Sequence, residues 1–440
     1  MKSWTPHSWQ SLPVPQQPEY PHPGELEKVL ARLRTLPPLV VAEEVDRLRA
    51  LLAEASLGKR FLLQGGDCAE RFQDCTAEAI ADKLRVLLQM SVVLTHSGRR
   101  PVVRVGRIAG QYAKPRSNDW EEIQGIRIPS YRGDLINGIE ASLDSRQPNP
   151  ERLERAYFHA AATLNHIRAL IEGGFADLHH PERWDLHQAS HEAYRAILDQ
   201  VRESLDFLST LGNLDRGALE RIDFFTSHEA LLLGYEAALT RWVPRAGYYN
   251  LGAHMLWVGE RTRVLGGAHL EYLRGLRNPL GIKVGPSATP EALLEILALL
   301  NPEDQAGRIT LITRFGAGSI GEALPPILKA VKRSGRSVLW SCDPMHGNGT
   351  TTGSGLKTRS FEAILSELKQ AFECHREAGT HLGGVHFELT GENVTECLGG
   401  GEKISEADLA KAYATGCDPR LNGNQSLEMA FLIADMLRKR

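Results

Sequence analysis

Cationic side chains recur along this chain directly after, or inside, short runs rich in valine, isoleucine and leucine. Arginine presents a planar guanidinium that grips phosphate or carboxylate through two hydrogen bonds. Several converging cations are costly to bury unless an anion joins them. One such residue means little, whereas the whole set predicts a substrate with several negative charges. The set comprises Arg107, Lys114, Arg116, Arg261, Lys283 and Arg314.

A second group offers ligands for a metal ion. Its members are Cys68, His346, Glu388 and Asp418. Thiolate, imidazole and carboxylate are the ligand types that bind Mn²⁺, Fe²⁺, Co²⁺ or Zn²⁺. No local motif links the four, a lone cysteine or histidine usually packs in a core, and the segment around Asp418 also fits an Asp-Pro turn. The residue types alone therefore leave a metal site and unrelated packing roles equally open.

The elements that must position these groups form a regular alternation of β-rich runs and helical patterns. Such an alternation, repeated eight times, predicts a (β/α)₈ barrel (a TIM barrel), with an open doubly wound sheet as the alternative. In a barrel the carboxyl ends of the strands carry the active site. The expected strands are Phe61–Gln64, Val102–Gly106, Asp223–Ser227, Ala253–Val258, Ile282–Gly285, Ile309–Thr313, Ser337–Ser341 and Val385–Leu389.

Two additions to the barrel are expected. Residues 1–58 form an extended arm followed by two amphipathic helices, and residues 59–440 form the catalytic barrel. More than 110 residues separate the second expected strand from the third, which predicts a helical insertion at about 177–213. Because apolar stripes on such helices need a cover, we expect both additions to contact other subunits or ligands.

Bulk composition narrows the functional classes. The chain has 440 residues, 42% of them hydrophobic, and a formal net charge of −3. This balance favours neither nucleic acid nor an anionic membrane as a partner. Neither a signal peptide nor a run of the roughly 18 apolar residues that a membrane span needs is recognisable. The six cysteines are scattered, which is typical of a cytoplasmic protein. We expect a soluble cytoplasmic enzyme.

At these same positions the sequence resembles the type II (plant-type) 3-deoxy-D-arabino-heptulosonate 7-phosphate (DAHP) synthases. The resemblance runs from the first expected strand to the last expected helix and is weakest in Gly349–Gly355. The matching motifs are FLLQGGDCAERF (61–72), RIAGQYAKPRS (107–117), TSHEALLL (226–233), GERTR (259–263), CDPMHGN (342–348), FELTGENVTECLGG (387–400) and CDPRLN (417–422).

The resemblance implies a transferase that condenses phosphoenolpyruvate with D-erythrose 4-phosphate, releasing DAHP and phosphate. This is the first step of the shikimate pathway of aromatic amino acid biosynthesis. It implies one divalent metal ion, Mn²⁺, Co²⁺ or Fe²⁺ with Zn²⁺ or Cd²⁺ as alternatives, held by Cys68, His346, Glu388 and Asp418. Phosphoenolpyruvate would meet Arg107, Glu260, Arg261, Lys283 and Arg314, and erythrose 4-phosphate would meet Lys114, Arg116 and Ser117.

Elementary chemistry agrees with this reaction. The metal acts as a Lewis acid on the sugar aldehyde, C3 of phosphoenolpyruvate attacks that carbonyl, and water adds to the cationic C2. The resulting hemiketal expels phosphate. Lys283, Glu260, Glu229 and His346 are the expected catalytic residues. Glu229 or Glu260 would position or deprotonate the water, and the sequence does not distinguish between these two carboxylates.

Other interpretations compete with this one. A synthase that condenses phosphoenolpyruvate with a different aldose phosphate and a metal-dependent aldolase are alternatives among enzymes. A catalytically dead barrel serving as a binding subunit is an alternative of another class. We further expect a homodimer or homotetramer inhibited by an aromatic amino acid, tryptophan or phenylalanine. Because Cys417 precedes Asp418, we also hypothesise that oxidation of the metal-free enzyme links Cys68 to Cys417 and blocks metal binding, with a buried packing role for Cys417 as the alternative.

Overall fold

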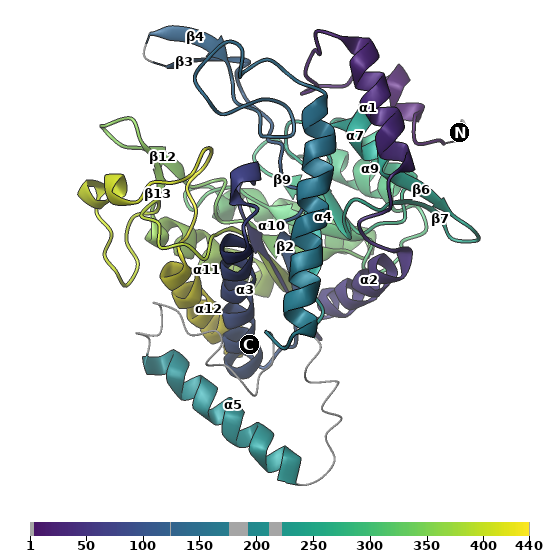
Figure 1. The fold of residues 1–440 in the computed structure, drawn as a ribbon. Coiled ribbons are helices and arrows are strands. Elements are labelled where there is room, and N and C mark those ends of the chain that lie inside the picture. Colours follow the sequence, from purple (N-terminus) through teal and green to yellow (C-terminus); the bar gives the residue numbers. More distant parts are fainter. Residues whose placement is uncertain (1–3, 124, 176–191, 211–221, 440) are drawn as a thin grey trace.

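The computed structural model describes residues 4–123, 125–175, 192–210 and 222–439. In these residues, parallel strands close into a barrel in the order β1, β14, β11, β10, β9, β8, β5, β2 (Figure 1). The barrel strands are β1 (Phe61–Gly66), β2 (Val102–Arg107), β5 (Phe225–Glu229), β8 (Met255–Val258), β9 (Leu280–Val284), β10 (Ile309–Thr313), β11 (Leu339–Cys342) and β14 (Leu382–Glu388).

The predicted barrel is confirmed strand by strand, and the open sheet is excluded because β1 pairs with both β14 and β2. The largest difference in the bounds is at the last strand, which begins at Leu382 rather than at Val385. The extra residues at that end include Gly383 and Gly384. They continue the strand because glycine leaves room for close neighbours: a Cβ atom on Gly384 would lie 2.6 Å from Cβ of Leu62.

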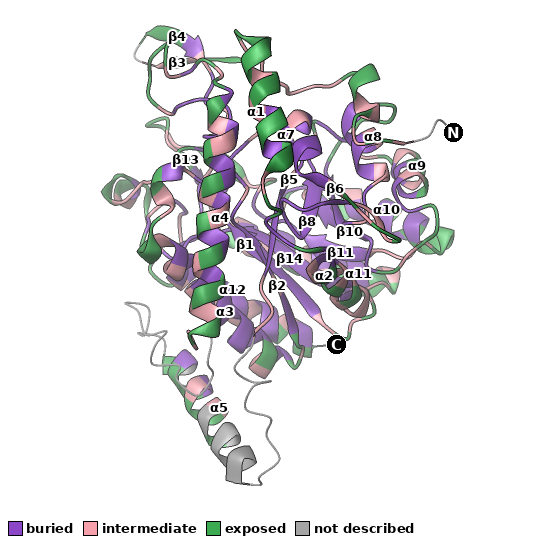
Figure 2. Ribbon diagram, turned by 45° about the vertical axis from the view of Figure 1, so that its right-hand side comes forward, coloured by how far each residue is buried: buried purple, intermediate pink, exposed green. Residues whose placement is uncertain are grey.

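Helices surround the barrel and cover the outward faces of its strands. The strands are buried on both faces (Figure 2), which explains their nearly continuous apolar sequences. The helices are α1 (Pro23–Thr35), α2 (Ala42–Ser56), α3 (Ala77–Gly98), α4 (Glu151–Glu172), α5 (Glu192–Thr210), α7 (Leu233–Ala238), α8 (Ala268–Arg274), α9 (Pro290–Leu300), α10 (Ile320–Ser334), α11 (Phe361–Ala378) and α12 (Gly423–Arg438), with short 3-10 turns at Ser8–Ser11, Phe72–Asp74 and Glu406–Lys411.

The apolar stripes of the N-terminal helices are covered by the chain itself. Leu33 on α1 and Val45, Leu48 and Leu52 on α2 are fully buried. Leu48 and Leu52 pack against barrel strands, and α1 packs against α4 and α7. The same chain therefore provides the cover that these stripes need, so they give no argument for the predicted subunit contact, which stays a prediction. The reason is that both helices fold back onto the rest of the chain.

The predicted insertion between β2 and β5 contains α4 and α5. Helix α4 lies beside α3 (Figure 1), and the first half of α5 contributes Tyr194 and Ile197 to the core, where they are 4% and 7% exposed. This part of the stripe on α5 is therefore covered too. The predicted segment 177–213 lies partly outside the described residues, which include only its part from 192 to 210.

Within the described ranges, three antiparallel hairpins interrupt the barrel pattern. Strands β3 (Trp120–Ile123) and β4 (Ile126–Pro129) follow β2, and β12 (Gly349–Thr351) and β13 (Lys357–Arg359) follow β11. Both hairpins thus stand at the carboxyl ends of the barrel strands. The third, β6 (Thr240–Val243) with β7 (Gly247–Asn250), precedes β8 at the opposite end.

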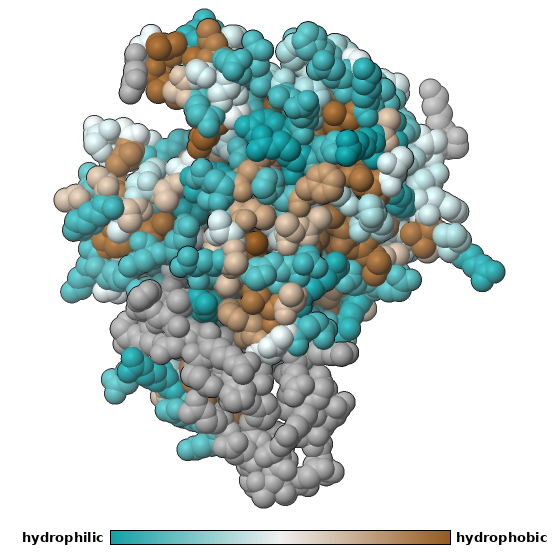
Figure 3. All heavy atoms as spheres, viewed as in Figure 1, coloured by the Kyte–Doolittle hydropathy of each residue, from teal (hydrophilic) through white to brown (hydrophobic). Residues whose placement is uncertain are grey.

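The face drawn in Figure 3 is mostly polar where residues are coloured, with apolar side chains in small groups. The β3–β4 hairpin carries exposed apolar side chains (Figure 3), because Trp120 and Ile126 are 48% and 56% exposed. Among the described helices, none combines the length and the apolar character that crossing a membrane requires.

Candidate active site at the carboxyl ends of the strands

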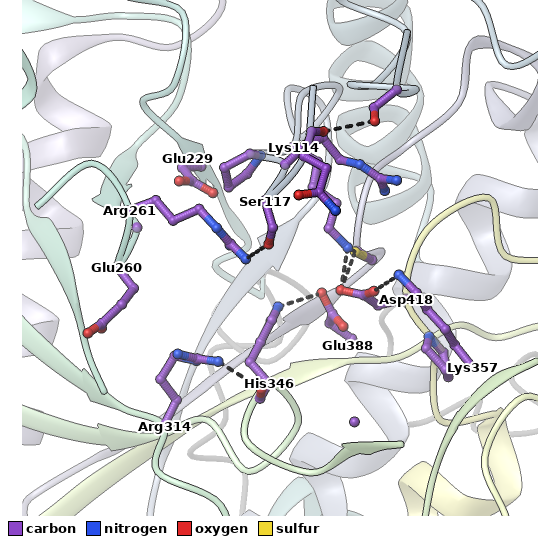
Figure 4. A pocket seen from close by; sticks show the side chains of 18 of the residues that line it. Lys114, Ser117, Glu229, Glu260, Arg261, Arg314, His346, Lys357, Glu388 and Asp418 are labelled. Atoms are coloured by element: carbon purple, nitrogen blue, oxygen red, sulfur yellow. Dashed lines mark hydrogen bonds and ion pairs between the residues drawn. The ribbon is translucent and has the colours of Figure 1, made fainter. Parts of the chain in front are cut away.

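One cavity of about 690 Å³ opens at the carboxyl ends of the barrel strands. Side chains from strand ends and from the two hairpins beside them point toward it (Figure 4). Every residue that the sequence suggested for the site lines this cavity: Cys68, Arg107, Lys114, Arg116, Ser117, Glu229, Glu260, Arg261, Lys283, Arg314, His346, Glu388 and Asp418. The structure therefore joins the cationic group and the metal-ligating group in one place.

The four candidate metal ligands lie close together. The ligand atoms of Cys68, Glu388 and Asp418 are all within 4.8 Å of one another. The imidazole of His346 adjoins them, with its Nε2 atom 3.0 Å from Oε1 of Glu388 (Figure 4). Residues that are distant in the sequence thus form one donor set of thiol, imidazole and carboxylates.

The register of the barrel accounts for part of this geometry. Gly66 at the end of β1 lies opposite Glu388 of β14 on one side and Arg107 of β2 on the other. The chain then turns at Gly66, whose φ is +146°, and a Cβ atom there would lie 2.5 Å from the carbonyl oxygen of Arg107. Only glycine fits this close approach, which brings Cys68 beside Glu388.

The imidazole of His346 is oriented by a second carboxylate. Its Nδ1 atom lies 2.7 Å from Oδ2 of Asp343, at the other side of the ring from Glu388. Although burial opposes it, the charges of His346 and Lys283 hold the pKa of Asp343 well below its usual range. A carboxylate that accepts the Nδ1 proton leaves Nε2 free as a ligand, which is the usual arrangement of metal-binding histidines.

Cations surround the donor set. The ammonium of Lys114 lies 2.9 Å from Sγ of Cys68 and also pairs with Asp418. Arg359 and Arg107 donate to the two oxygens of Glu388, at 2.6 and 3.1 Å. Although burial opposes it, His346 and Arg359 hold the pKa of Glu388 well below its usual range. Thiolate, imidazole and carboxylate are ligand types for divalent metal ions, and the ammonium of Lys114 already contacts both the thiol and a carboxylate. The donor set therefore fits a site for a divalent cation.

Four of the cations face the cavity from β2 and β9 and from the loops that follow β8 and β10. Arg107 is 2% exposed and stacks 5.3 Å from the ring centroid of Trp257. Lys283 pairs with Asp343, and burial lowers its pKa to about 8 against the attraction of that carboxylate. Arg314 donates to the carbonyl oxygen of His346 at 2.8 Å. Arg261 reaches across to donate to Oγ of Ser117 at 2.6 Å.

The group suggested for the sugar phosphate divides into two places. Lys114 lies against the thiol and carboxylates described above, whereas Arg116 pairs with Glu121 of β3 at 2.8 Å. Ser117 is held by Arg261. The β3–β4 hairpin therefore forms the side of the cavity where Arg116 and Ser117 lie.

The two candidate bases have different surroundings. Burial raises the pKa of Glu229, against the charges of Lys283 and Arg107, and its buried Oε1 atom has no hydrogen-bond partner among the described residues. Glu260 is engaged through Oε1 by Arg263 at 3.1 Å and by Ser287. Oε2 of Glu260 is likewise buried without a partner among the described residues, so Glu229 differs in its raised pKa and in the absence of a cation bound to its carboxylate, which make it the more available proton acceptor.

Several cavity residues were not identified from the sequence. Lys357 and Arg359 come from the β12–β13 hairpin and contact Asp418 and Glu388, although this part of the chain carried the weakest motif. Asp343 was visible in the motif CDPMHGN without an assigned role. Trp257 belongs to an apolar strand, where an aromatic residue is typical of the core, so the sequence held no signal for it.

The thiol of Cys417 lies next to that of Cys68. The two side chains form a hydrogen bond that lowers the pKa of Cys417, whereas burial raises that of Cys68. The six cysteines are all free thiols. The predicted closeness of this pair is confirmed, and its oxidation to a disulfide stays a prediction.

Comparison with known proteins matches the chain to one family along nearly its whole length. The model of the Class-II DAHP synthetase family matches residues 4–434. A phospho-2-dehydro-3-deoxyheptonate aldolase of Neurospora crassa is 48% identical over 457 residues, which cover 99% of this chain and 95% of that protein. The enzyme of the same name from Streptomyces coelicolor is 48% identical, with coverages of 98% and 97%, and AroG of Mycolicibacterium smegmatis is 46% identical, with coverages of 97% and 93%.

Proposed function

Because the chain belongs to the Class-II DAHP synthetase family and is a 3-deoxy-7-phosphoheptulonate synthase, we propose that it condenses phosphoenolpyruvate with D-erythrose 4-phosphate. The products are DAHP and inorganic phosphate, and the reaction is the first step of the shikimate pathway. One observation carries the proposal: a single cavity combines a set of cations with a thiol, imidazole and carboxylate donor set. The cations match substrates with two phosphates and a carboxylate.

We infer that phosphoenolpyruvate binds among Arg107, Arg261, Lys283 and Arg314, with Glu260 beside them. The guanidinium groups grip its phosphate and carboxylate, and their fixed partners limit the freedom that binding must remove. Lys283 is buried, so its charge acts on the substrate with little screening by water. These contacts hold the enol so that its C3 atom faces the aldehyde of the second substrate.

The proposed metal ligands are Cys68, His346, Glu388 and Asp418, and the donor set suits Mn²⁺, Co²⁺ or Fe²⁺, with Zn²⁺ or Cd²⁺ as alternatives. A bound ion supplies a Lewis acid that polarises the carbonyl of the sugar. Asp343 keeps the ring of His346 in the orientation that presents Nε2 to the cavity. Lys114, Arg116 and Ser117 hold the phosphate of erythrose 4-phosphate, on the side of the β3–β4 hairpin.

Glu229 is the proposed base. Attack of C3 on the aldehyde leaves C2 electron-poor, water adds there, and a carboxylate must accept the proton of that water. The unpaired Oε1 atom of Glu229 and its raised pKa suit this task. Glu260 orients Arg263 and supports the phosphoenolpyruvate side. The tetrahedral adduct then collapses with loss of phosphate.

We further propose a cytoplasmic homodimer or homotetramer that an aromatic amino acid inhibits. Exposed apolar side chains such as Phe158 on α4 and Trp120 on β3 are 48% exposed each, and a partner subunit is one way to cover them. Tryptophan and phenylalanine are the expected effectors, because an enzyme at the entry of a branched pathway benefits from feedback.

The decisive experiment measures phosphate release by the purified protein with both substrates, before and after chelation and after Mn²⁺ is restored. We expect release only when both substrates and metal are present. Other aldose phosphates serve as the specificity control. Glu229→Gln should lower kcat far more than Glu260→Gln, which should mainly raise the KM for phosphoenolpyruvate. Phosphate release that ignores chelation, or that needs no sugar, would overturn the proposed reaction.

A further inference from the structure

A buried carboxylate outside the cavity links two loops that carry site residues. Glu367 lies on α11 and is fully buried. Its Oε1 atom accepts hydrogen bonds from the backbone N–H groups of Phe315 and Gly316, at 2.8 and 2.9 Å. Its Oε2 atom accepts one from Nδ2 of Asn348, at 2.6 Å.

The donors belong to the loops that follow β10 and β11. Phe315 is the residue after Arg314, and Asn348 lies two residues after His346. The side chain of Asn348 extends the link, because its Oδ1 atom accepts from the backbone N–H of Ala317 at 3.0 Å. Glu367 therefore fixes the loop of Arg314 against the loop of His346.

The same two loops also meet on the cavity side. Arg314 donates to the carbonyl oxygen of His346 at 2.8 Å (Figure 4). Between that contact and Glu367 the two backbones touch at Gly316, whose φ is +89°, and a Cβ atom there would lie 2.7 Å from the carbonyl oxygen of Gly347. The loops thus form one unit, held by the cavity contact on one side and by Glu367 on the other.

The number of hydrogen-bond donors that face Glu367 explains why a carboxylate occupies this position. Burying a negative charge is unfavourable unless a cation pairs with it. The described residues provide no ion pair for Glu367. The nearby charge with the largest effect on it is Asp343, which has the same sign. A glutamine would bury more cheaply, but its amide has one acceptor oxygen and one donor group. It could not accept from all three donors.

We propose that Glu367 is a positioning residue that sets the place of Arg314 in the phosphoenolpyruvate site. The inference rests on the proposed function for the role of Arg314. Glu367 touches no substrate and acts through the backbone of Phe315 and Gly316. Its loss lets the loop of Arg314 shift relative to that of His346 while the barrel stays folded.

The first test is Glu367→Gln. The amide of the new side chain places a donor against Nδ2 of Asn348. We expect the KM for phosphoenolpyruvate to rise roughly tenfold, the equivalent of about one hydrogen bond, and the KM for erythrose 4-phosphate to stay within about twofold. Glu373→Gln is the matched control, because Glu373 is exposed on the same helix, and it should leave both constants unchanged.

The second test is rescue. Asn348→Asp in the Glu367→Gln protein turns the facing donor into an acceptor for the new amide. The same substitution removes the hydrogen bond that Nδ2 of Asn348 donates to the carbonyl oxygen of Pro344, at 2.8 Å, whether or not Glu367 is changed. Asn348→Asp alone sets two carboxylates against each other and should bind phosphoenolpyruvate more weakly. We expect the double variant to lose less affinity than the sum of the losses in the two single variants, because the loss of the Pro344 contact is common to both proteins that carry Asn348→Asp. Circular dichroism and thermal melting of each variant report the fold.

Three results would overturn the proposal: an unchanged KM for phosphoenolpyruvate in Glu367→Gln, equal losses for both substrates that track a loss of thermal stability, or a double variant whose change in log KM equals the sum of the two single changes. The proposed function is judged separately, on the wild-type protein. If that protein releases phosphate from both substrates while the Glu367→Gln constants do not change, the positioning role alone is wrong.

Discussion

Glu367→Gln also makes a prediction about stability that can be worked out from the structure. Burial raises the pKa of Glu367 from the ordinary 4.5 to about 7, with Asp343 acting in the same direction and the hydrogen bonds of Gly316 and Phe315 acting against it. A carboxyl group with a raised pKa binds its proton more tightly in the folded than in the unfolded chain. The free energy of unfolding must therefore fall as the pH rises from about 4.5 to about 7, and it levels off above that window.

The magnitude follows from the size of the shift. Each pKa unit corresponds to about 1.4 kcal/mol, so a rise from 4.5 to about 7 costs about 3 kcal/mol once the group is ionised in both states. About 2.5 kcal/mol of this lies between pH 5 and pH 8. Glutamine does not ionise, so the variant escapes that loss, although it forfeits hydrogen bonds at every pH.

The assay is urea unfolding followed by tryptophan fluorescence, for the wild type, Glu367→Gln and the exposed control Glu373→Gln, at pH 5, 6, 7 and 8. The stability of Glu367→Gln relative to wild type should improve by about 2.5 kcal/mol between pH 5 and pH 8, and that of the control should stay constant. A difference between Glu367→Gln and wild type that does not vary with pH by more than about 0.5 kcal/mol would refute the reasoning.

Cys68→Ser and His346→Ala should each lower turnover by roughly 100-fold or more with an unchanged circular dichroism spectrum; full activity of either variant after exhaustive chelation contradicts the proposed metal site. Dilute hydrogen peroxide should join Cys68 to Cys417 in the chelated enzyme, as peptide mapping can detect, and two free thiols in the inactivated protein count against that disulfide. Tryptophan or phenylalanine, alone or paired, should reduce the rate at saturating metal, whereas a rate indifferent to every aromatic amino acid and mixture ends the regulatory proposal.

The sequence predicted the barrel because its strands are buried on both faces and therefore form apolar runs. A run such as Ile309–Thr313 is short and rich in β-branched residues, which favours a strand over a buried helix, and the structure reproduces its bounds without change. The candidate site followed from topology: parallel strands in a barrel all end at one mouth, so residues placed after the runs had to converge. Arg107 and Glu388 met because β1 pairs with both of their strands.

The sequence could not predict site residues whose contacts follow no periodic pattern along the chain. Lys357 and Arg359 reach the cavity from a hairpin with no apolar alternation, and Glu367 acts from a helix face that any amphipathic pattern assigns to the core. The sequence also did not show that other parts of the same chain cover α1 and α2, for a related reason. A stripe of leucines indicates that something covers it, but it does not identify the covering segment. Here other parts of the same chain cover the stripes, which only the folded structure shows.

The two groups of residues that the sequence separates by chemistry form one electrostatic unit in the structure. Lys114 pairs with Asp418, Arg107 with Glu388 and Lys283 with Asp343, so each of these charges has a partner of opposite sign. Glu388 and Asp418 have further cationic partners, Arg359 and Lys357, whereas Asp343 depends on Lys283 as its one lysine or arginine partner among the described residues. Removing Lys283 alone leaves that buried carboxylate without a cation, which is more damaging than removing both charges.

A single substitution here therefore reports more than a lost substrate contact. Lys283→Met, for example, would leave Asp343 without its ammonium partner and so disturb His346, whose Nδ1 atom the same carboxylate holds. Paired substitutions are the measurement that separates the two effects. The comparison is between free-energy losses, calculated from the activity of each variant. If the loss in the double variant Lys283→Met with Asp343→Asn is no smaller than the sum of the two single losses, the charges act independently and the idea of one coupled unit is wrong.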